Sequence, residues 1–170
     1  MRLGVPDRMI DRLLQTCLPA FPGPLSSCGL QLEPMSMEPS TPPDSDGIRT
    51  LESPDSFQGT VARLSSSLET HGIKIFTIID QQAEAAAVGL AMPAVTLILF
   101  GNPKAGTPLM VAQPTSALDL PLKAVVWATE NGGVFVSFNT AGYLIARHHL
   151  PEALAANLAP AEKLIAAALF

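Results

Sequence analysis

The sequence predicts an α+β domain of two layers, in which helices cover one face of a mainly antiparallel sheet. A helical segment whose apolar residues are spaced three and four apart separates two short runs typical of strands. Two later apolar runs, 122–129 and 134–138, are joined only by Glu130-Asn131-Gly132-Gly133, a tight turn between antiparallel neighbours. With a last helical segment over 151–170, the expected order is a strand, a helix, three or four strands with a short helical crossing between them, and a C-terminal helix.

The first half of the domain is expected to contain a strand, a helix and a second strand. Imperfect alternation over 48–52 indicates a short edge strand. Ser53-Pro54 supplies the residue types preferred at a helix N-cap and first turn. The helix that follows places apolar side chains on one face, namely Phe57, Val61, Leu64 and Leu68. Gly72 ends this helix, and the β-branched run 73–79 predicts the second strand.

The middle of the domain is expected to pass from strand to helix twice. Asp80 ends the second strand and is most simply an N-cap for a short, alanine-rich helix over 81–88, which Gly89 closes. The continuous apolar run 95–100 then predicts a strand that is buried on both faces, because it shows no alternation.

The loop after this third strand is the best candidate for a binding site. Residues 101–106 are interpreted as a glycine-bounded loop that carries Lys104, and Thr107-Pro108 as the start of a helix to about residue 113. Backbone N–H groups at a helix start, with a lysine beside them, can hold an anion. The alternative is a structural turn in which Gly101 and Gly106 supply unusual φ angles. The two glycines have P-loop spacing, but the lysine that would precede Thr107 is absent, so nucleotide hydrolysis is not expected.

Two acidic residues are grouped with this loop. Asp119 is spaced i, i+4 from Lys123, and the two are expected to pair with each other or with Lys104 and Asp80 across the ends of the sheet. The candidate ligand-binding residues are Asp80, Gly101, Asn102, Lys104, Gly106, Thr107 and Asp119.

The last third of the domain is expected to hold the hairpin and two helices. Trp127, Phe135 and Phe138 on the hairpin are expected in the core, with a groove or a dimer face as the alternative. Residues 141–148 predict a helix, and Pro160 should kink or restart the final one. Because adjacent histidines point apart, His148-His149 is not expected to bind a metal, and no cofactor is predicted.

Composition limits the classes of function. The 170 residues are 48% hydrophobic and only 15% charged, which indicates apolar surface hidden by a partner. The net charge of −5 and the absence of a basic stripe exclude nucleic acid as a partner.

No apolar run approaches the roughly 20 residues that span a bilayer, so a cytoplasmic protein without membrane contact is expected. No Ser-His-Asp set or redox dithiol can be assembled, so a binding or protein-interaction domain is favoured over an enzyme. An enzyme with a polar cleft built on Asp80, Lys104 and Asp119 is the remaining alternative.

The first 45 residues differ from the rest of the chain. Nine of the 16 prolines precede Phe57, and the segment is rich in Pro and Ser, so residues 1–45 are predicted to be a disordered extension of a domain at 46–170. Met35 and Met37 lie within it, which leaves open whether residues 1–36 are translated.

Four phrases together resemble the domain-of-unknown-function family 302: residues 64–80, 97–110, 118–127 and 136–144. F-G-N-P-K-A-G-T-P-L-M followed by L-D-L-P-L-K is the most specific part. The resemblance implies a β-α-β4-α fold related to TATA-binding-protein-like folds, small homodimers, and no established activity. The family usually has Asp-His where this chain has Asp80-Gln81, and an acidic residue after the tryptophan where this chain has Ala128. These departures weaken an acid–base or metal role.

Overall fold

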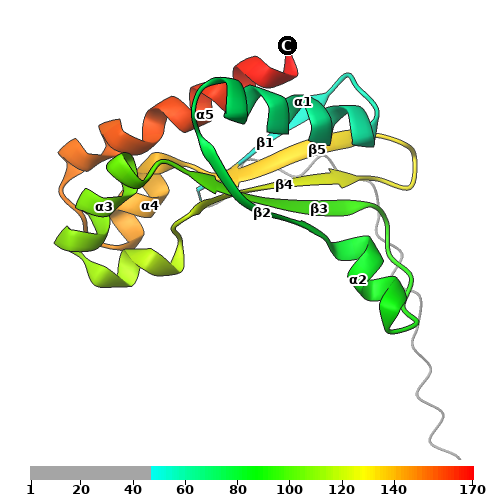
Figure 1. Ribbon diagram of the computed structural model, residues 1–170, viewed down its shortest axis with the longest axis horizontal. Coiled ribbons are helices and arrows are strands. Elements are labelled where there is room, and N and C mark those ends of the chain that lie inside the picture. The colour runs from blue at the N-terminus through cyan, green and yellow to red at the C-terminus, as the bar shows by residue number, and fades with distance from the viewer. Residues whose placement is uncertain (1–46) are drawn as a thin grey trace, which may run out of the picture. The chain divides into compact units, whose positions relative to one another are not determined.

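The computed structural model describes residues 47–170, and its single sheet carries two long helices on one face (Figure 1). The strands are β1 (Ile48–Ser53), β2 (Lys74–Asp80), β3 (Val95–Gly101), β4 (Leu122–Ala128) and β5 (Val134–Asn139). The helices are α1 (Phe57–Thr70), α2 (Gln81–Ala87), α3 (Pro103–Ala112), α4 (Ala141–Arg147) and α5 (Ala155–Leu169), with 3₁₀ turns η1 (Pro114–Leu118) and η2 (Glu152–Leu154). The α+β prediction is confirmed. The predicted disordered extension at 1–45 lies outside the described residues.

The sheet is antiparallel throughout, with strand order β1-β5-β4-β3-β2. The β4–β5 hairpin predicted from Asn131-Gly132 is present, and Gly132 has a φ of +85°. The edge strand β2 runs against β3 with Lys74 opposite Gly101 and Asp80 opposite Thr96. Phe76 interrupts this register as a bulge between Ile75 and Thr77.

The main core lies between the sheet and the pair α1 and α5, which pack on the same face (Figure 1). Leu64 and Leu68 of α1 are fully buried, as the apolar spacing predicted, and Ile165 of α5 is 1% exposed. Facing them are alternate strand residues, including Ile98, Phe100, Val126 and Val136. Burial of each such side chain contributes about 1.5–3 kcal/mol relative to exposure.

Two predicted helix boundaries are corrected by the structure. Helix α1 begins at Phe57, because the Ser56 side chain accepts a hydrogen bond from the Gly59 amide and so acts as the N-cap. Ser53, expected to be that cap, ends β1 and its hydroxyl bonds the buried hydroxyl of Thr60 at 2.7 Å. Helix α5 runs without a break from Ala155 to Leu169 with Pro160 inside it, so it does not restart at Pro160, and the kink expected there stays a prediction.

No helix of the described residues lies over the opposite face of the sheet (Figure 1). Apolar residues on that face form a strip that includes Leu97 and Val125, so β3 is fully buried on one face and not on both as expected. Strand register places Leu97 opposite Val125, and Val95 opposite Trp127. Trp127 stacks on Phe135 with ring centroids 4.7 Å apart, whereas Phe138 points to the helical face and is 5% exposed. The three aromatic residues therefore divide between two surfaces. None of the helices in the described residues has the length and apolar character needed to cross a membrane.

Candidate functional site

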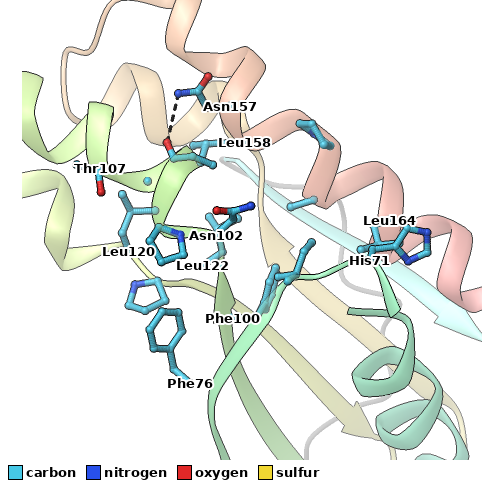
Figure 2. Close-up of a pocket in the computed structure, with 18 of the residues that line it drawn as sticks. His71, Phe76, Phe100, Asn102, Thr107, Leu120, Leu122, Asn157, Leu158 and Leu164 are labelled. Atoms are coloured by element: carbon cyan, nitrogen blue, oxygen red, sulfur yellow. Dashed lines mark hydrogen bonds between the residues drawn. The ribbon is translucent and has the colours of Figure 1, made fainter. Parts of the chain in front are cut away.

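A cavity of about 590 Å³ lies at one end of the sheet, between the ends of β2 and β3, helix α3 and helix α5 (Figure 2). Its wall combines segments far apart in the sequence: His71, Ile73, Phe76, Phe100, Gly101, Asn102, Pro103, Ala105, Gly106, Thr107, Met110, Leu120, Pro121, Leu122, Asn157, Leu158, Pro160, Ala161 and Leu164. The volume falls within the roughly 300–1,000 Å³ typical of small-molecule sites.

The cavity wall is mainly apolar, with a few polar groups. Phe100 and Leu158 are buried, and Phe76 and Leu120 complete the apolar surface. Among the lining residues with polar side chains, Thr107 and Asn157 lie at one side in Figure 2, and His71 lies beside Leu164 at the other. Neither a carboxylate nor a lysine or arginine is among these lining residues. Such a surface suits a ligand with an apolar body and few polar atoms.

The segment predicted to be a loop is the first turn of helix α3. Asn102 is the N-cap, and its Oδ1 accepts from the Lys104 amide at 2.9 Å. Pro103 occupies the first helical position, which suits its fixed φ and missing N–H. The amides of Ala105 and Gly106 donate to the Asn102 carbonyl. The Asn102-Pro103 pair is thus the helix start, and Thr107-Pro108 lies inside the helix.

This correction changes the structural interpretation of the glycines. Neither Gly101 nor Gly106 has a positive φ, so neither is needed for an unusual backbone conformation. Gly101 belongs to β3 and pairs with Lys74, while Gly106 sits within α3 and faces Leu120.

The structure brings together four of the seven candidate residues in the cavity wall: Gly101, Asn102, Gly106 and Thr107. Lys104 belongs to the same turn and is exposed, but it is not a lining residue. Asp80 lies at the far end of β2, where its Oδ1 caps α2 by accepting from the Ala83 amide at 2.9 Å. Asp80 is six positions after Lys74 in β2, which at about 3.3 Å per residue places the two about 20 Å apart.

Asp119 pairs with neither Lys123 nor Lys104. Its Oδ2 lies 2.6 Å from Nε2 of His148 and 3.2 Å from Nε of Arg147, so it ties the segment before β4 to the end of α4. His148 is 6% exposed, and Lys123 instead donates to the carbonyl of Leu118. The hydrogen bond from Arg147 to the Tyr143 hydroxyl, then the charge of Asp119, raises the pKa of Arg147 above its ordinary value.

Several site residues were missed by the sequence prediction. Asn157 of α5 donates from Nδ2 to the Ala105 carbonyl at 3.2 Å and links α5 to α3, across a sequence separation of 52. His71 and Phe76 enter the wall because β2 returns beside β3. No local pattern marks these three residues, since only tertiary packing brings them to the cavity. Within residues 47–170, no group of three or more His, Cys, Asp or Glu is placed to hold a metal ion.

Comparison with known proteins gives one family and two kinds of relative. The family model described as "Domain of unknown function DUF302" matches residues 49–168. A crystal structure of an uncharacterized conserved protein DUF302 from Bacillus stearothermophilus has a TM-score of 0.63 and 22% identity, covering 72% of this chain and 95% of that one. At this identity the match shows the fold alone.

The curated relatives include proteins named fluoride-specific ion channel FluC 1, from Brucella suis and from Brucella abortus. Each is 38% identical over 104 residues, or 61% of this chain. The match covers 41% of the Brucella suis protein and 38% of the Brucella abortus protein, so this chain corresponds to about two fifths of their length.

Proposed function

We propose that this chain, which belongs to the DUF302 family, binds a small and largely apolar molecule in the cavity between β3, α3 and α5. The observation that carries the proposal is the cavity itself, about 590 Å³ in volume and lined mainly by apolar side chains. Aromatic and aliphatic walls with a few polar groups are typical of small-molecule sites.

The apolar body of the ligand would rest against Phe100, Leu122 and Leu164, and its polar end would lie near the start of α3. Asn102 supports this orientation. Its Oδ1 accepts from the Lys104 amide, whereas its Nδ2 donates to no group of the described residues and can donate to the polar end of a ligand. An anionic end, expected from the sequence, remains a prediction.

Binding without catalysis fits the placement of the polar residues better than an enzyme does. Asp80 lies at the end of β2 that is remote from the strand partner of Gly101. Asp119 is paired with His148 and Arg147. A polar cleft on Asp80, Lys104 and Asp119 would need all three groups within reach of one substrate.

Filling the cavity tests the proposal. Gly106→Leu projects a side chain toward Leu120 in the cavity wall, whereas Gly142→Leu in α4 meets open space and serves as the control. The neutral fluorescent probe N-phenyl-1-naphthylamine should bind the wild type and Gly142→Leu saturably, with about tenfold or greater loss in Gly106→Leu. Unsaturable binding, or equal binding by both variants, would reject the cavity as a site. Circular dichroism of each variant checks that it is folded.

The homodimer expected from the family resemblance is also proposed, with the uncovered sheet face as its interface. Support comes from the apolar strip that contains Leu97, Val125 and Trp127. The polar group of Trp127 is already satisfied, since its Nε1 donates to Ser137 at 2.9 Å. Val125→Glu should convert a dimer to a monomer in light scattering after gel filtration, while Lys163→Glu on α5 should not. A monomeric wild type would rule out this interface.

A second candidate function follows from the curated relatives. They are named as fluoride-specific ion channels, and this chain matches only about two fifths of their length. We propose as the alternative that the chain acts together with a fluoride channel of this kind and alters fluoride transport. Fluoride efflux from vesicles containing a purified channel of this kind should change when the chain is added. Efflux that is unaltered at saturating chain concentration rejects this candidate.

A further inference from the structure

We infer that the ligand of the cavity is an amphipathic anion, with its apolar body inside and its negative end between Lys74 and Lys104 beside Asn102. The inference rests on the proposed binding function and adds the chemical class of the ligand. It depends on the arrangement of cations around an apolar cavity.

Lys74 is placed at the cavity by strand pairing. It is the β2 residue opposite Gly101, and Gly101 is a lining residue directly followed by Asn102. The Nζ of Lys74 lies 4.8 Å from the centroid of the Phe76 ring, and Phe76 also lines the cavity. This cation–π contact places the ammonium group beside an aromatic residue of the cavity wall, although Lys74 is exposed and is not itself a lining residue.

Lys104, two residues after Asn102 in the first turn of α3, supplies a second cation. Its flanking residues Pro103 and Ala105 both line the cavity, and its own side chain is exposed. No carboxylate of the described residues forms an ion pair with Lys104 or Lys74. Both ammonium groups therefore remain available to an external anion.

Negative charge is held away from this edge of the cavity. No acidic residue lines the cavity, and Asp119 is paired with Arg147 and His148. Glu69, on the last turn of α1, is exposed and does not line it. In a chain with a net charge of −5, a cationic edge beside an uncharged cavity favours entry of anions over cations.

The apolar wall determines the rest of the ligand. A charged group within that wall would lose its hydration without an ionic partner, which is costly. A charge at the edge, close to Lys74 and Lys104, keeps part of its water and gains attraction from both cations. A single carboxylate at the end of an alkyl or aromatic body satisfies both conditions. His71, the titratable lining residue, lies at the side of Leu164 in Figure 2 and is not required for this contact.

A matched series of molecules with a ten-carbon chain tests the inference on the full chain. Calorimetric titration with decanoate, decan-1-ol and decyltrimethylammonium, each below its aggregation concentration, compares one alkyl body with three head groups. Decanoate should bind about tenfold more tightly than decan-1-ol, and the ammonium compound most weakly. Lys74→Gln and Lys104→Gln should each weaken decanoate binding about threefold and leave decan-1-ol binding unchanged. Lys163→Gln, an exposed lysine of α5 outside the cavity wall, is the control and should change neither.

The outcomes separate the two proposals. If decan-1-ol binds as tightly as decanoate and the lysine variants behave like wild type, the cavity binds ligands but the inferred class is wrong. A loss in Lys163→Gln equal to that in Lys74→Gln would also overturn the inference, because overall charge would then be responsible. If none of the three molecules binds, the proposed function fails together with the inference.

Discussion

Two strand-to-helix junctions in this chain are built alike but differ in what surrounds them. At the first, Asp80 ends β2 and its side chain caps α2. At the second, Asn102 follows β3 and its side chain caps α3. Both cap distances are 2.9 Å, and both residues were candidates for a binding site. Of the two, only Asn102 lines the cavity between β3, α3 and α5.

The difference comes from the packing of other elements. Helix α2 has no buried residue and extends from the far end of the sheet (Figure 1). Helix α3 buries Leu109 to 1% exposure and is held to α5 by the Asn157 hydrogen bond to Ala105. A capped helix start is therefore a local feature, whereas the cavity requires α5 and the segment before β4 to pack beside it.

The largest expected effect contrasts a buried residue of β3 beside the cavity with an exposed residue of β2 nearer the first junction. Phe100→Ala removes a side chain that is 1% exposed and should lower the free energy of unfolding by about 3–5 kcal/mol. Ile78→Ala, nearer the first junction, removes a side chain that is 46% exposed and should cost about 1 kcal/mol or less. Urea denaturation measures both. Similar losses of unfolding free energy in the two variants would contradict the difference in packing between these two positions.

The next effect concerns the anchor of the cavity wall. Asp119→Ala removes the partner of the buried His148 and frees the segment that leads into Leu120 and Pro121, so it should cost about 3 kcal/mol. Asp55→Ala breaks an exposed ion pair with Arg63 and should cost less than about 1 kcal/mol. The same denaturation experiment compares them. A small loss in Asp119→Ala would mean that the wall does not depend on this anchor.

The sequence predicted the features that depend on local signals and missed those that depend on tertiary packing. Apolar spacing predicted the buried face of α1 through Leu64 and Leu68, and Asn131-Gly132 predicted the hairpin, because both signals are local. Asp80 was recognised as a cap for the same reason. The start of α3 was predicted four residues too late, since Asn102-Pro103 and Thr107-Pro108 are equally good start signals and only packing distinguishes them.

Four of the candidate ligand-binding residues nevertheless share the cavity wall, because Gly101, Asn102, Gly106 and Thr107 belong to one continuous segment; their role in binding stays a prediction. The rest of the wall could not be predicted from spacing. Asn157 reaches Ala105 across 52 residues, and Asp119 reaches His148 across 29. Such pairings depend on how α5 and α4 pack, and neither leaves a periodic pattern in the sequence.

The two caps should have equal effects on stability but different effects on binding. Asp80→Ala and Asn102→Ala each remove a side-chain acceptor at a helix start, at a cost of about 1 kcal/mol. Only Asn102→Ala should weaken the binding of decanoate in calorimetry, because only Asn102 lines the cavity. Asn102→Asp retains a cap acceptor and should retain stability. A binding defect in Asp80→Ala would show that the first junction also contributes to the site.

The smallest expected effect contrasts one glycine of each helix, Gly106 inside α3 and Gly89 just after α2. Gly106 lies within α3 without a positive φ, and an added Cβ would make an ordinary contact with Leu120 at 3.8 Å. Gly106→Ala should therefore raise the free energy of unfolding by about 0.5–1 kcal/mol, because alanine restricts the unfolded chain and favours the helix. Gly89 follows α2 with a φ of +78°, which strains any residue with a side chain, so Gly89→Ala should lower stability by a similar amount. Thermal unfolding should show a higher midpoint for Gly106→Ala and a lower midpoint for Gly89→Ala. Such opposite changes would confirm that Gly89 is needed for its backbone angle, whereas Gly106 is not. A loss of stability in Gly106→Ala would instead mean that the cavity wall beside Leu120 cannot accommodate one methyl group.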